Sequence, residues 1–356
     1  MNTEQKLELI TQVGEEIITQ EDLKQLLDKK KNPVAYDGFE PSGQAHLAQG
    51  LVRAINIEKM LKAGCKFKML VADWHAMANN KFDGNLDNIQ TAGEYLIEVW
   101  KASGLDTGKV EFVWASELVK DPDYWKKVMR IAMNSTVKRV TRCSQIMGRA
   151  ESDSLKASQI FYPCMQAADI FHLGVDIPQL GMDQRKVNVL ARELGEKLGY
   201  WKPVAVHHHM LMGLQLPKTE QQGEQRAIAM KMSKSIPDSA IFMTDPESEV
   251  KRKISKAYCP EKQAEENPVI EYCKHIVFEK KKSMKIERPE KFGGNTEYNS
   301  FADLEKDYLE GKLHPMDLKS GTANSINALL EPVRKHFRKG KAKNLLEQVE
   351  AMKVTR

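Results

Sequence analysis

The sequence PVAYDGFEPSGQAHLAQG at residues 33–50 decides the fold class, because it joins a short strand to a helix through a turn. Its first seven residues are mostly apolar, which is typical of a short strand. Residues 40–43 combine proline, serine and glycine, the usual chemistry of a turn. From Ala45 onward the apolar residues recur with helical spacing as far as Met60. The stretch therefore predicts the first strand and helix of an α/β domain.

Three further segments repeat this pattern and extend the prediction. Residues 67–73 (FKMLVAD), 110–114 (VEFVW) and 173–177 (LGVDI) predict strands, and helical sequence separates them. The first of these is apolar and almost unbroken, as expected for a strand that is buried on both faces. Short buried strands that alternate with helices predict a doubly wound, Rossmann-like parallel sheet with right-handed crossovers.

The chain has 356 residues, which is enough for about two domains. The sequence becomes charged and helical, without strand candidates, after about residue 245. We therefore expect an N-terminal helical extension at residues 1–32, a Rossmann-type domain at 33–240, and a helical domain at 241–356.

Composition excludes several classes of protein. The chain carries 54 Lys and Arg against 49 Asp and Glu, a net charge of +5, which permits a polyanionic partner without requiring one. No apolar stretch approaches the roughly 18–20 residues that span a bilayer, and the first residues do not resemble a secretory signal. The five cysteines are widely spaced, so we expect free thiols in a reducing cytosol rather than disulfides or a zinc finger.

Two segments carry candidate chemistry. His46 lies where the first predicted strand passes into a helix, which is the ligand crevice of an open parallel sheet. A helix N-terminus offers N–H groups to phosphate, although a single segment of this kind is more often structural. The second segment is KMSKS at residues 231–235, where Lys231 and Lys234 flank Ser233. Such a loop could close over a triphosphate and neutralise the departing pyrophosphate, or it could be an ordinary solvated loop.

Together, HLAQ at residues 46–49 and KMSKS at residues 231–235 resemble the paired motifs of the class I aminoacyl-tRNA synthetases. The second motif matches the family pattern letter for letter. The first departs from it, because Gln49 stands where the family has a second histidine. Gln49 donates a hydrogen bond but cannot carry charge.

Further strings resemble the archaeal and eukaryotic type of tyrosyl-tRNA synthetase, in order from about residue 33 to residue 338. They are YDGFEPSG (36–43), YPCMQAAD (162–169), GMDQRK (181–186), RPEKFGG (288–294) and LHPMDLK (313–319). The resemblance implies a catalytic Rossmann-type domain, with a helical dimer insertion at about 115–160 and the KMSKS loop at about 220–240. It also implies that the helical domain binds the anticodon.

The resemblance also implies a role for each matching residue. The tyrosine phenol would be bound by Tyr36 and Asp169, and its α-amino group by Tyr162, Gln166 and Gln184. The ATP and adenylate site would consist of Gly38, Glu40, His46, Gln49, Lys231, Ser233 and Lys234, of which His46, Lys231 and Lys234 would be catalytic. The tRNA would be contacted by Arg142 and Arg185 at the acceptor stem, and by Phe292 and Asp317 at the first anticodon base.

The implied reaction has two steps. The tyrosine carboxylate attacks the α-phosphate of Mg²⁺-bound ATP, and the 3′-terminal adenosine of tRNA(Tyr) then takes the tyrosyl group. The resemblance implies a cytoplasmic homodimer without a tightly bound cofactor. We expect no transition metal at residues 207–209, because adjacent histidines on a strand point to opposite faces.

The spacing of residues within YPCMQAAD (162–169), read as a helix, agrees with these roles. Tyr162, Gln166 and Asp169 fall at i, i+4 and i+7, on one face of a helix, so they can point into one cavity. A floor made of a carboxylate and a phenol needs a hydroxyl on the ligand, because phenylalanine would leave both groups unpaired. Without the resemblance, the sequence favours a surface charge for Asp169 and an ordinary polar position for Gln166. Trp74 and His75 are further candidates for the lining.

Two alternative functions remain open at this stage. A tryptophanyl-tRNA synthetase shares the fold and both motifs, although the pair Tyr36 and Asp169 favours a ligand with a hydroxyl. A catalytically idle relative that binds RNA is the other alternative, and Gln49 is the only hint toward it.

Overall fold

The computed structural model describes residues 1–147, 154–216, 226, 230–232 and 237–353. A six-stranded sheet with the strand order β1-β6-β5-β2-β3-β4 forms its centre. Its strands are β1 (Glu16–Ile18), β2 (Val34–Phe39), β3 (Lys66–Val71), β4 (Val110–Trp114), β5 (Ile177–Gly181) and β6 (Ala205–His208). Five of them run parallel, and β1 is antiparallel to β6 at one edge. The doubly wound prediction is confirmed, with the strand order reversing between β2 and β5.

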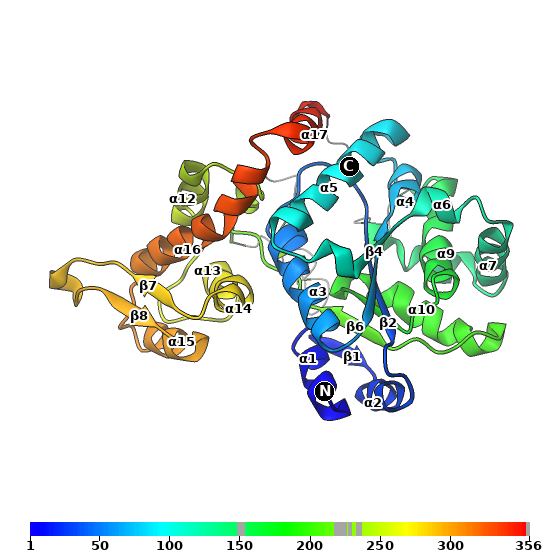
Figure 1. Cartoon of the computed structure of the whole chain (residues 1–356), viewed down its shortest axis with the longest axis horizontal. Coiled ribbons are helices and arrows are strands. Elements are labelled where there is room, and N and C mark those ends of the chain that lie inside the picture. The colour runs from blue at the N-terminus through cyan, green and yellow to red at the C-terminus, as the bar shows by residue number, and fades with distance from the viewer. Residues whose placement is uncertain (148–153, 217–225, 227–229, 233–236, 354–356) are drawn as a thin grey trace.

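Helices cover both faces of this sheet (Figure 1). On one face lie α3 (Arg53–Lys62) and α5 (Leu86–Ala102); on the other lie α7 (Pro122–Met133), α9 (Ala157–His172) and α10 (Arg185–Gly195). The side chains of β2 alternate between the two faces of the sheet. Ala35 and Phe39 therefore join the core beneath α3 and α5, whereas Tyr36 joins the core beneath α7 and α9. The remaining helices around the sheet are α1 (Thr3–Thr11), α2 (Gln20–Lys29), the π-helical turn η1 (Ala48–Val52), α4 (Asp73–Ala78), α6 (Ala115–Leu118) and α8 (Val137–Thr141).

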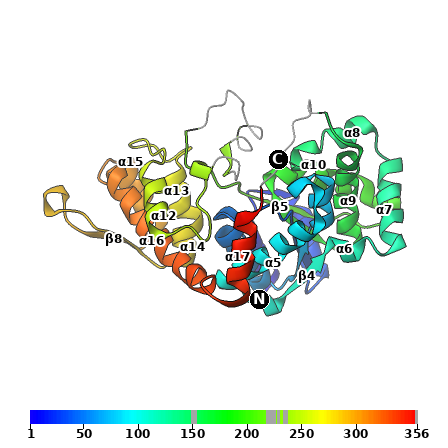
Figure 2. The same ribbon diagram turned by 90° about the horizontal axis from the view of Figure 1, so that it is seen from above.

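The second half of the chain is mainly helical, as expected, but it also contains a hairpin. Its elements are α12 (Glu247–Ser255), α13 (Pro268–Tyr272), the π-helical turn η8 (Cys273–Val277), α14 (Phe278–Lys280), β7 (Met284–Ile286), β8 (Thr296–Tyr298), α15 (Phe301–Leu309), α16 (Pro315–His336) and α17 (Gly340–Ala351). The antiparallel pair β7–β8 was not predicted. Figures 1 and 2 both show α17 returning to lie beside α5, and one apolar core runs from the sheet domain into the helical domain.

Three details of the sheet differ from the sequence-based expectations. The N-terminal 32 residues are not helical throughout, because β1 interrupts them and extends the sheet. The strand predicted at 173–177 is displaced, and β5 begins only at Ile177. The strand β6 was not predicted. Both β1 and β6 are four residues or shorter, so neither carries a clear alternating pattern of its own.

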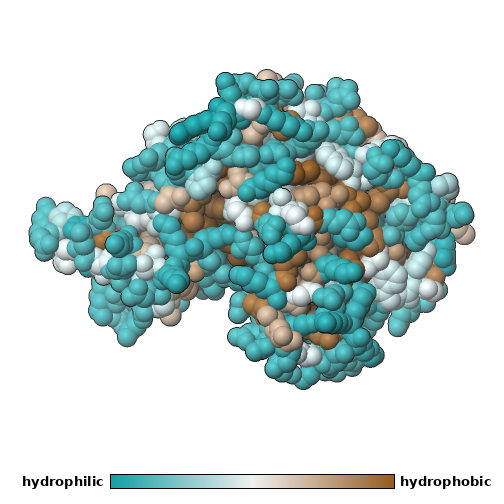
Figure 3. All heavy atoms as spheres, viewed as in Figure 1, coloured by the Kyte–Doolittle hydropathy of each residue, from teal (hydrophilic) through white to brown (hydrophobic). Residues whose placement is uncertain are grey.

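Three further observations concern the hydropathy of the surface, the apolar character of the helices and the state of the cysteines. On the face seen in Figure 3, apolar side chains gather over the middle of the sheet domain, and hydrophilic ones cover most of the helical domain. Within the described ranges, no helix is both long and apolar enough to cross a membrane. All five cysteines are free, and four of them are buried.

Candidate active site

A cavity of about 920 Å³ opens at the carboxyl ends of β2 and β5, where the strand order reverses. Most of the predicted tyrosine and nucleotide residues line it. They are Tyr36, Gly38, Glu40, His46, Gln49, Tyr162, Gln166, Asp169, Gln184 and Lys231. The structure thus brings together side chains from β2, η1, α9, the start of α10 and the first residue of the KMSKS motif. The predicted Ser233 and Lys234 lie outside the described residues.

Tyr36 and Asp169 are both buried at one end of the cavity, with exposed fractions of 1% and 0%. Burial, followed by the charge of Asp169, raises the pKa of Tyr36 well above its usual value, so the phenol stays protonated. The prediction that both residues share one buried cavity is confirmed. Asp169 is therefore not the surface charge that its sequence alone would also permit.

Two residues that the motifs do not include hold the Asp169 carboxylate. The Tyr124 hydroxyl, from α7, donates to Asp169 Oδ1 at 2.9 Å. His75 Nε2, from α4, lies 3.0 Å from Asp169 Oδ2. Burial lowers the pKa of His75, but the neighbouring carboxylate outweighs this and raises it above the usual value. His75 lines the cavity as expected, whereas its neighbour Trp74 packs against Trp125 outside it.

The helical face of α9 carries its three polar side chains into the cavity, as the i, i+4, i+7 spacing predicted. Gln166 Nε2 donates to Gln184 Oε1 at 3.0 Å, and Gln184 Nε2 donates to the carbonyl of Ile146 at 3.2 Å. Tyr162 hydrogen-bonds the Glu40 carboxylate; burial and this contact raise the pKa of Tyr162 well above its usual value. Two amide oxygens, a phenol and a carboxylate form a suitable environment for a ligand ammonium group.

Asn79 fixes the Glu40 carboxylate and was missed by the motif comparison. Its Nδ2 lies 3.1 Å from both carboxylate oxygens of Glu40 and 3.2 Å from the carbonyl of Met147. Asn79 is fully buried. Its position after the short helix α4 carries no sequence signal for this role.

His46 precedes η1 and forms an isolated antiparallel bridge with Phe242. The backbone N–H of His46 donates to Gln49 Oε1 at 3.5 Å, so the Gln49 side chain folds back toward the residue that precedes the π-helical turn. His46 is buried at the edge of the cavity. The expected position at the start of a helix is confirmed, although the first turn is π-helical rather than α-helical.

Lys231 contacts a carboxylate across the nucleotide end of the cavity. Its Nζ lies 2.8 Å from Asp183 Oδ2, and Asp183 also lines the cavity. Lys231 forms an isolated antiparallel bridge with Met212, which links the start of the KMSKS motif to the chain beyond β6.

A buried ion pair lies beside this end of the cavity and was also missed. Arg53, one helical turn beyond Gln49, pairs with Asp37 of β2 and contacts the ring of His208 at 2.8 Å. Asp37 is fully buried, and burial raises its pKa to about 7 although Arg53 opposes the shift. Gln179 Nε2 donates to the same histidine at 2.7 Å. Asp37 and Arg53 are separated in sequence, so no local pattern indicates their pairing.

The three adjacent histidines make separate contacts. His207 pairs with Glu16 of β1, His208 with Arg53, and His209 with Glu15 and Glu271. In the part of the chain that the structure describes, no group of His, Cys, Asp and Glu side chains is arranged to hold a metal ion.

None of the four predicted tRNA residues is among those that line the cavity, although Arg185 directly follows Gln184. Arg142 is exposed at the end of α8, and Arg185 at the start of α10 pairs with Glu16 at 2.8 Å. In the helical domain, Asp317 lies half-buried in the first turn of α16, and Phe292 lies in a short 3₁₀ turn at Glu290–Phe292. Their roles stay predictions.

The fold and the cavity define a Rossmann-type α/β protein with a polar cavity at the point where the strand order reverses. The chain belongs to the class I tRNA synthetases for tryptophan and tyrosine, whose family model matches residues 28–331, and within them to the archaeal and eukaryotic tyrosine–tRNA ligases.

Individual relatives support this membership. The chain is 52% identical to tyrosine–tRNA ligase 1, cytoplasmic, of Arabidopsis thaliana, over 99% of this chain and 90% of that one. It is 42% identical to the tyrosine–tRNA ligase of Saccharolobus islandicus over the whole of both chains. The solved structure of Pyrococcus horikoshii tyrosyl-tRNA synthetase complexed with L-tyrosine matches with a TM-score of 0.91 and 40% identity, over 99% of this chain and 100% of that one. A tryptophanyl-tRNA synthetase from Aeropyrum pernix, at 18% identity and a TM-score of 0.66, shares the fold alone.

Proposed function

We propose that this protein is a tyrosine–tRNA ligase, which activates L-tyrosine with ATP and transfers it to the 3′-terminal adenosine of tRNA(Tyr). The observation that carries the proposal is the cavity floor, where Tyr36 and Asp169 are buried together. A phenol can donate a hydrogen bond to Asp169 and accept one from Tyr36, whereas indole carries one N–H donor and no acceptor, so tryptophan would leave the Tyr36 hydroxyl without a partner. The membership described above supports the same specificity.

The proposal gives the following residues roles in this reaction. Asp169 and Tyr36 bind the substrate phenol, and Gln166, Gln184 and Tyr162 bind its ammonium group. The bound carboxylate then attacks the α-phosphate of ATP, which enters as its magnesium complex. His46, Lys231 and Lys234 stabilise the charge that develops on the phosphates, so that catalysis comes from positioning and electrostatics without a covalent enzyme intermediate.

Amino-acid-dependent exchange of pyrophosphate into ATP tests the proposal. The purified chain should catalyse exchange with tyrosine, and not with tryptophan or phenylalanine. Exchange that depends on tryptophan would establish the other member of the family instead. RNA binding without any exchange would identify an idle relative, in which Gln49 had replaced a required histidine.

Recognition of tRNA gives a separate prediction for the helical domain. We infer that Asp317 hydrogen-bonds and Phe292 stacks on the first anticodon base, while Arg142 and Arg185 approach the acceptor stem. Asp317→Arg should therefore raise the KM for tRNA(Tyr) in aminoacylation by at least about tenfold, the cost of one lost base contact. Tyrosine-dependent exchange should be unchanged, because Asp317 lies outside the cavity. A parallel loss of exchange would mean that the substitution disturbs the fold.

We also propose a homodimer that forms through the insertion between β4 and β5. Exposed apolar side chains gather there on α7, α8 and α9: Met129, Met133, Val137 and Phe161. Met133 is 80% exposed, which is costly for a methionine in a monomer. Met133→Asp should shift the protein from dimer to monomer in sedimentation velocity, whereas Met316→Asp, at an exposed methionine in the helical domain, should not. A wild-type monomer at micromolar concentration would refute the dimer.

The cytoplasm is the proposed location, in line with the name of the Arabidopsis relative.

A further inference from the structure

The turn that carries His46 rests on the segment that follows the KMSKS loop. Leu47 N donates to the carbonyl of Ile241 at 3.0 Å, and Met243 N donates to the carbonyl of Ala45 at 2.8 Å. Between these two hydrogen bonds, His46 and Phe242 form the β-bridge. The position of His46 therefore depends directly on the position of residues 241–243.

Side-chain packing makes this contact tight. A Cβ atom added to Gly50 would lie 2.3 Å from Met243 Sδ, so the π-helical turn after His46 approaches Met243 as closely as a glycine permits. Met243 itself is fully buried. A contact without free space transmits a displacement of one segment to the other.

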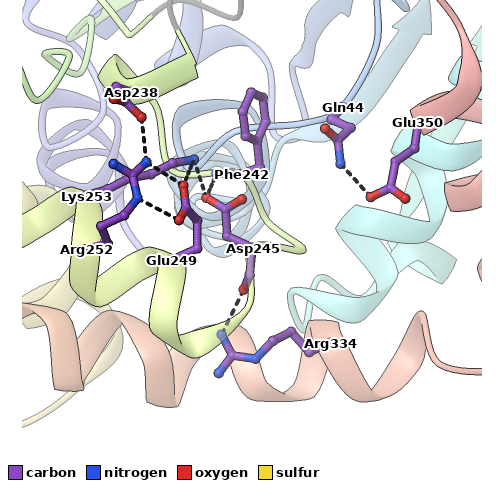
Figure 4. A network of polar contacts seen from close by, with 9 residues as sticks. All are labelled: Gln44, Asp238, Phe242, Asp245, Glu249, Arg252, Lys253, Arg334 and Glu350. Atoms are coloured by element: carbon purple, nitrogen blue, oxygen red, sulfur yellow. Dashed lines mark hydrogen bonds and ion pairs between the residues drawn. The ribbon is translucent and has the colours of Figure 1, made fainter.

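The helical domain holds the same segment from the opposite side, through Lys253 of α12 (Figure 4). The Lys253 side chain is only 3% exposed, and its Nζ lies 2.7 Å from Asp245 Oδ2. The same carboxylate oxygen accepts the backbone N–H of Phe242 at 2.9 Å. The Lys253 ammonium group also lies 4.9 Å from the centre of the Phe242 ring, within the range of a cation–π contact.

Two arginines of the helical domain surround this contact. Arg334 of α16 donates to the carbonyl of Asp245 at 3.3 Å, and Arg252 of α12 joins Asp238 to Glu249. Both ion pairs of Arg252 are partly exposed to solvent, whereas the pair of Lys253 and Asp245 is buried. A buried lysine is rare and remains charged only when it is paired, so Lys253 is the member of this network whose loss should matter most.

We propose that Lys253 is a positioning residue for adenylate formation: from the helical domain it fixes the turn at residues 242–245, and through that turn the position of His46. The inference rests on the proposed ligase activity and adds to it a residue outside the catalytic cavity. Tyrosine binding does not depend on this contact, because the residues that bind tyrosine come from β2, α9 and the start of α10.

Lys253→Met tests the proposal, since it keeps an unbranched side chain that is one atom shorter and removes the charge. The kcat of tyrosine-dependent pyrophosphate exchange should fall at least about tenfold, because small displacements of a catalytic group have large effects on rate. The KM for tyrosine should stay within about twofold, as expected when only an interaction with the transition state is lost. Lys251→Met is the matched control on the same helix, and it should match the wild type because Lys251 is exposed and pairs with the exposed Glu247.

A coupled substitution separates positioning from general stability. Asp245→Asn removes the charge that faces Lys253, and its effect on kcat should not add to that of Lys253→Met, because both act through one contact. If Lys253→Met does not fold, Phe242→Leu replaces it in the same assay and should lower kcat without changing the KM for tyrosine.

The results that would overturn the inference differ from those that concern the proposed function. If the wild type is active and the folded Lys253→Met protein has an unchanged kcat, the positioning role alone is refuted. A rise in the KM for tyrosine in parallel with the fall in kcat would show that Lys253 is merely structural. A wild type without tyrosine-dependent exchange would refute the ligase function itself.

Discussion

Tyr124 shows how single residues outside the motifs complete the site. Its hydroxyl donates to Asp169 Oδ1 at 2.9 Å, so one carboxylate oxygen is already occupied before a substrate phenol arrives. His75 lies against the other oxygen. The carboxylate is therefore held in one orientation by side chains from α4 and α7, and it presents its remaining lone pairs to the cavity.

We predict that Tyr124→Phe raises the KM for tyrosine by about three- to tenfold in pyrophosphate exchange. A hydrogen bond to a charged acceptor is worth roughly 1.5–3 kcal/mol, and we expect part of this cost to appear in tyrosine binding because the freed carboxylate is less well oriented. Tyr200→Phe removes a hydroxyl that accepts a hydrogen bond from Arg130 near the surface and should leave the KM unchanged. Equal kinetics in Tyr124→Phe and the wild type would show that Asp169 needs no orienting partner.

At the level of elements, α5 illustrates how closely the helices pack on the sheet. Its residue Gly93 faces Trp114 of β4 and Val71 of β3, and an added Cβ would lie 2.7 Å and 2.8 Å from their side chains. The indole ring is rigid and only partly exposed, so it has little room to retreat.

We predict that Gly93→Ala lowers the free energy of unfolding by about 1–3 kcal/mol, the usual cost of overpacking. Alanine is the better helix former, so the sign of the effect identifies steric conflict rather than helix propensity. Urea unfolding followed by circular dichroism measures it. Gly108→Ala is the control, since its Cβ would meet nothing closer than Asp106 Oδ1 at 3.4 Å. A Gly93→Ala protein that is as stable as the wild type would show that the layers can separate.

The prediction of elements from sequence succeeded where a segment is long enough to show a period. The buried strand β3 and the helices α5 and α9 were found because each carries a pattern of its own. The strands β1 and β6 and the hairpin β7–β8 have three or four residues each, and their pairing is determined by neighbours far along the chain.

Across the whole molecule, His209 joins three parts of the chain. One ring nitrogen lies 3.1 Å from Glu15 of the N-terminal segment, and the other lies 3.1 Å from Glu271 of the helical domain. The ring stacks on His275. Burial lowers the pKa of His209, but the two carboxylates more than compensate and raise it to about 9. Burial and the positive His209 lower the pKa of His275 to about 3, so His275 stays neutral.

This contact predicts how stability depends on pH. An unfolded histidine titrates near pH 6.5, so the stabilisation by protonated His209 is complete below that pH and disappears as the pH rises through about 9. Because the ring is about one-third exposed, we expect a loss of roughly 1–2 kcal/mol between pH 6.5 and 9.5. Thermal unfolding of the wild type and of His209→Asn at both pH values measures it. The variant should lose less stability over this interval, and an identical loss would contradict the prediction.

The sequence by itself determined the doubly wound sheet, the paired nucleotide motifs and the face of α9 that lines the cavity. These features follow from spacing within one segment, where backbone geometry dictates which side chains share a face. Only the tertiary structure decided that Asp169 is buried and held by Tyr124 and His75, that Arg53 pairs with Asp37, and that Lys253 reaches the turn beside His46. Each of these contacts joins separate elements, and its strength comes from the exclusion of water, which depends on how the whole chain packs.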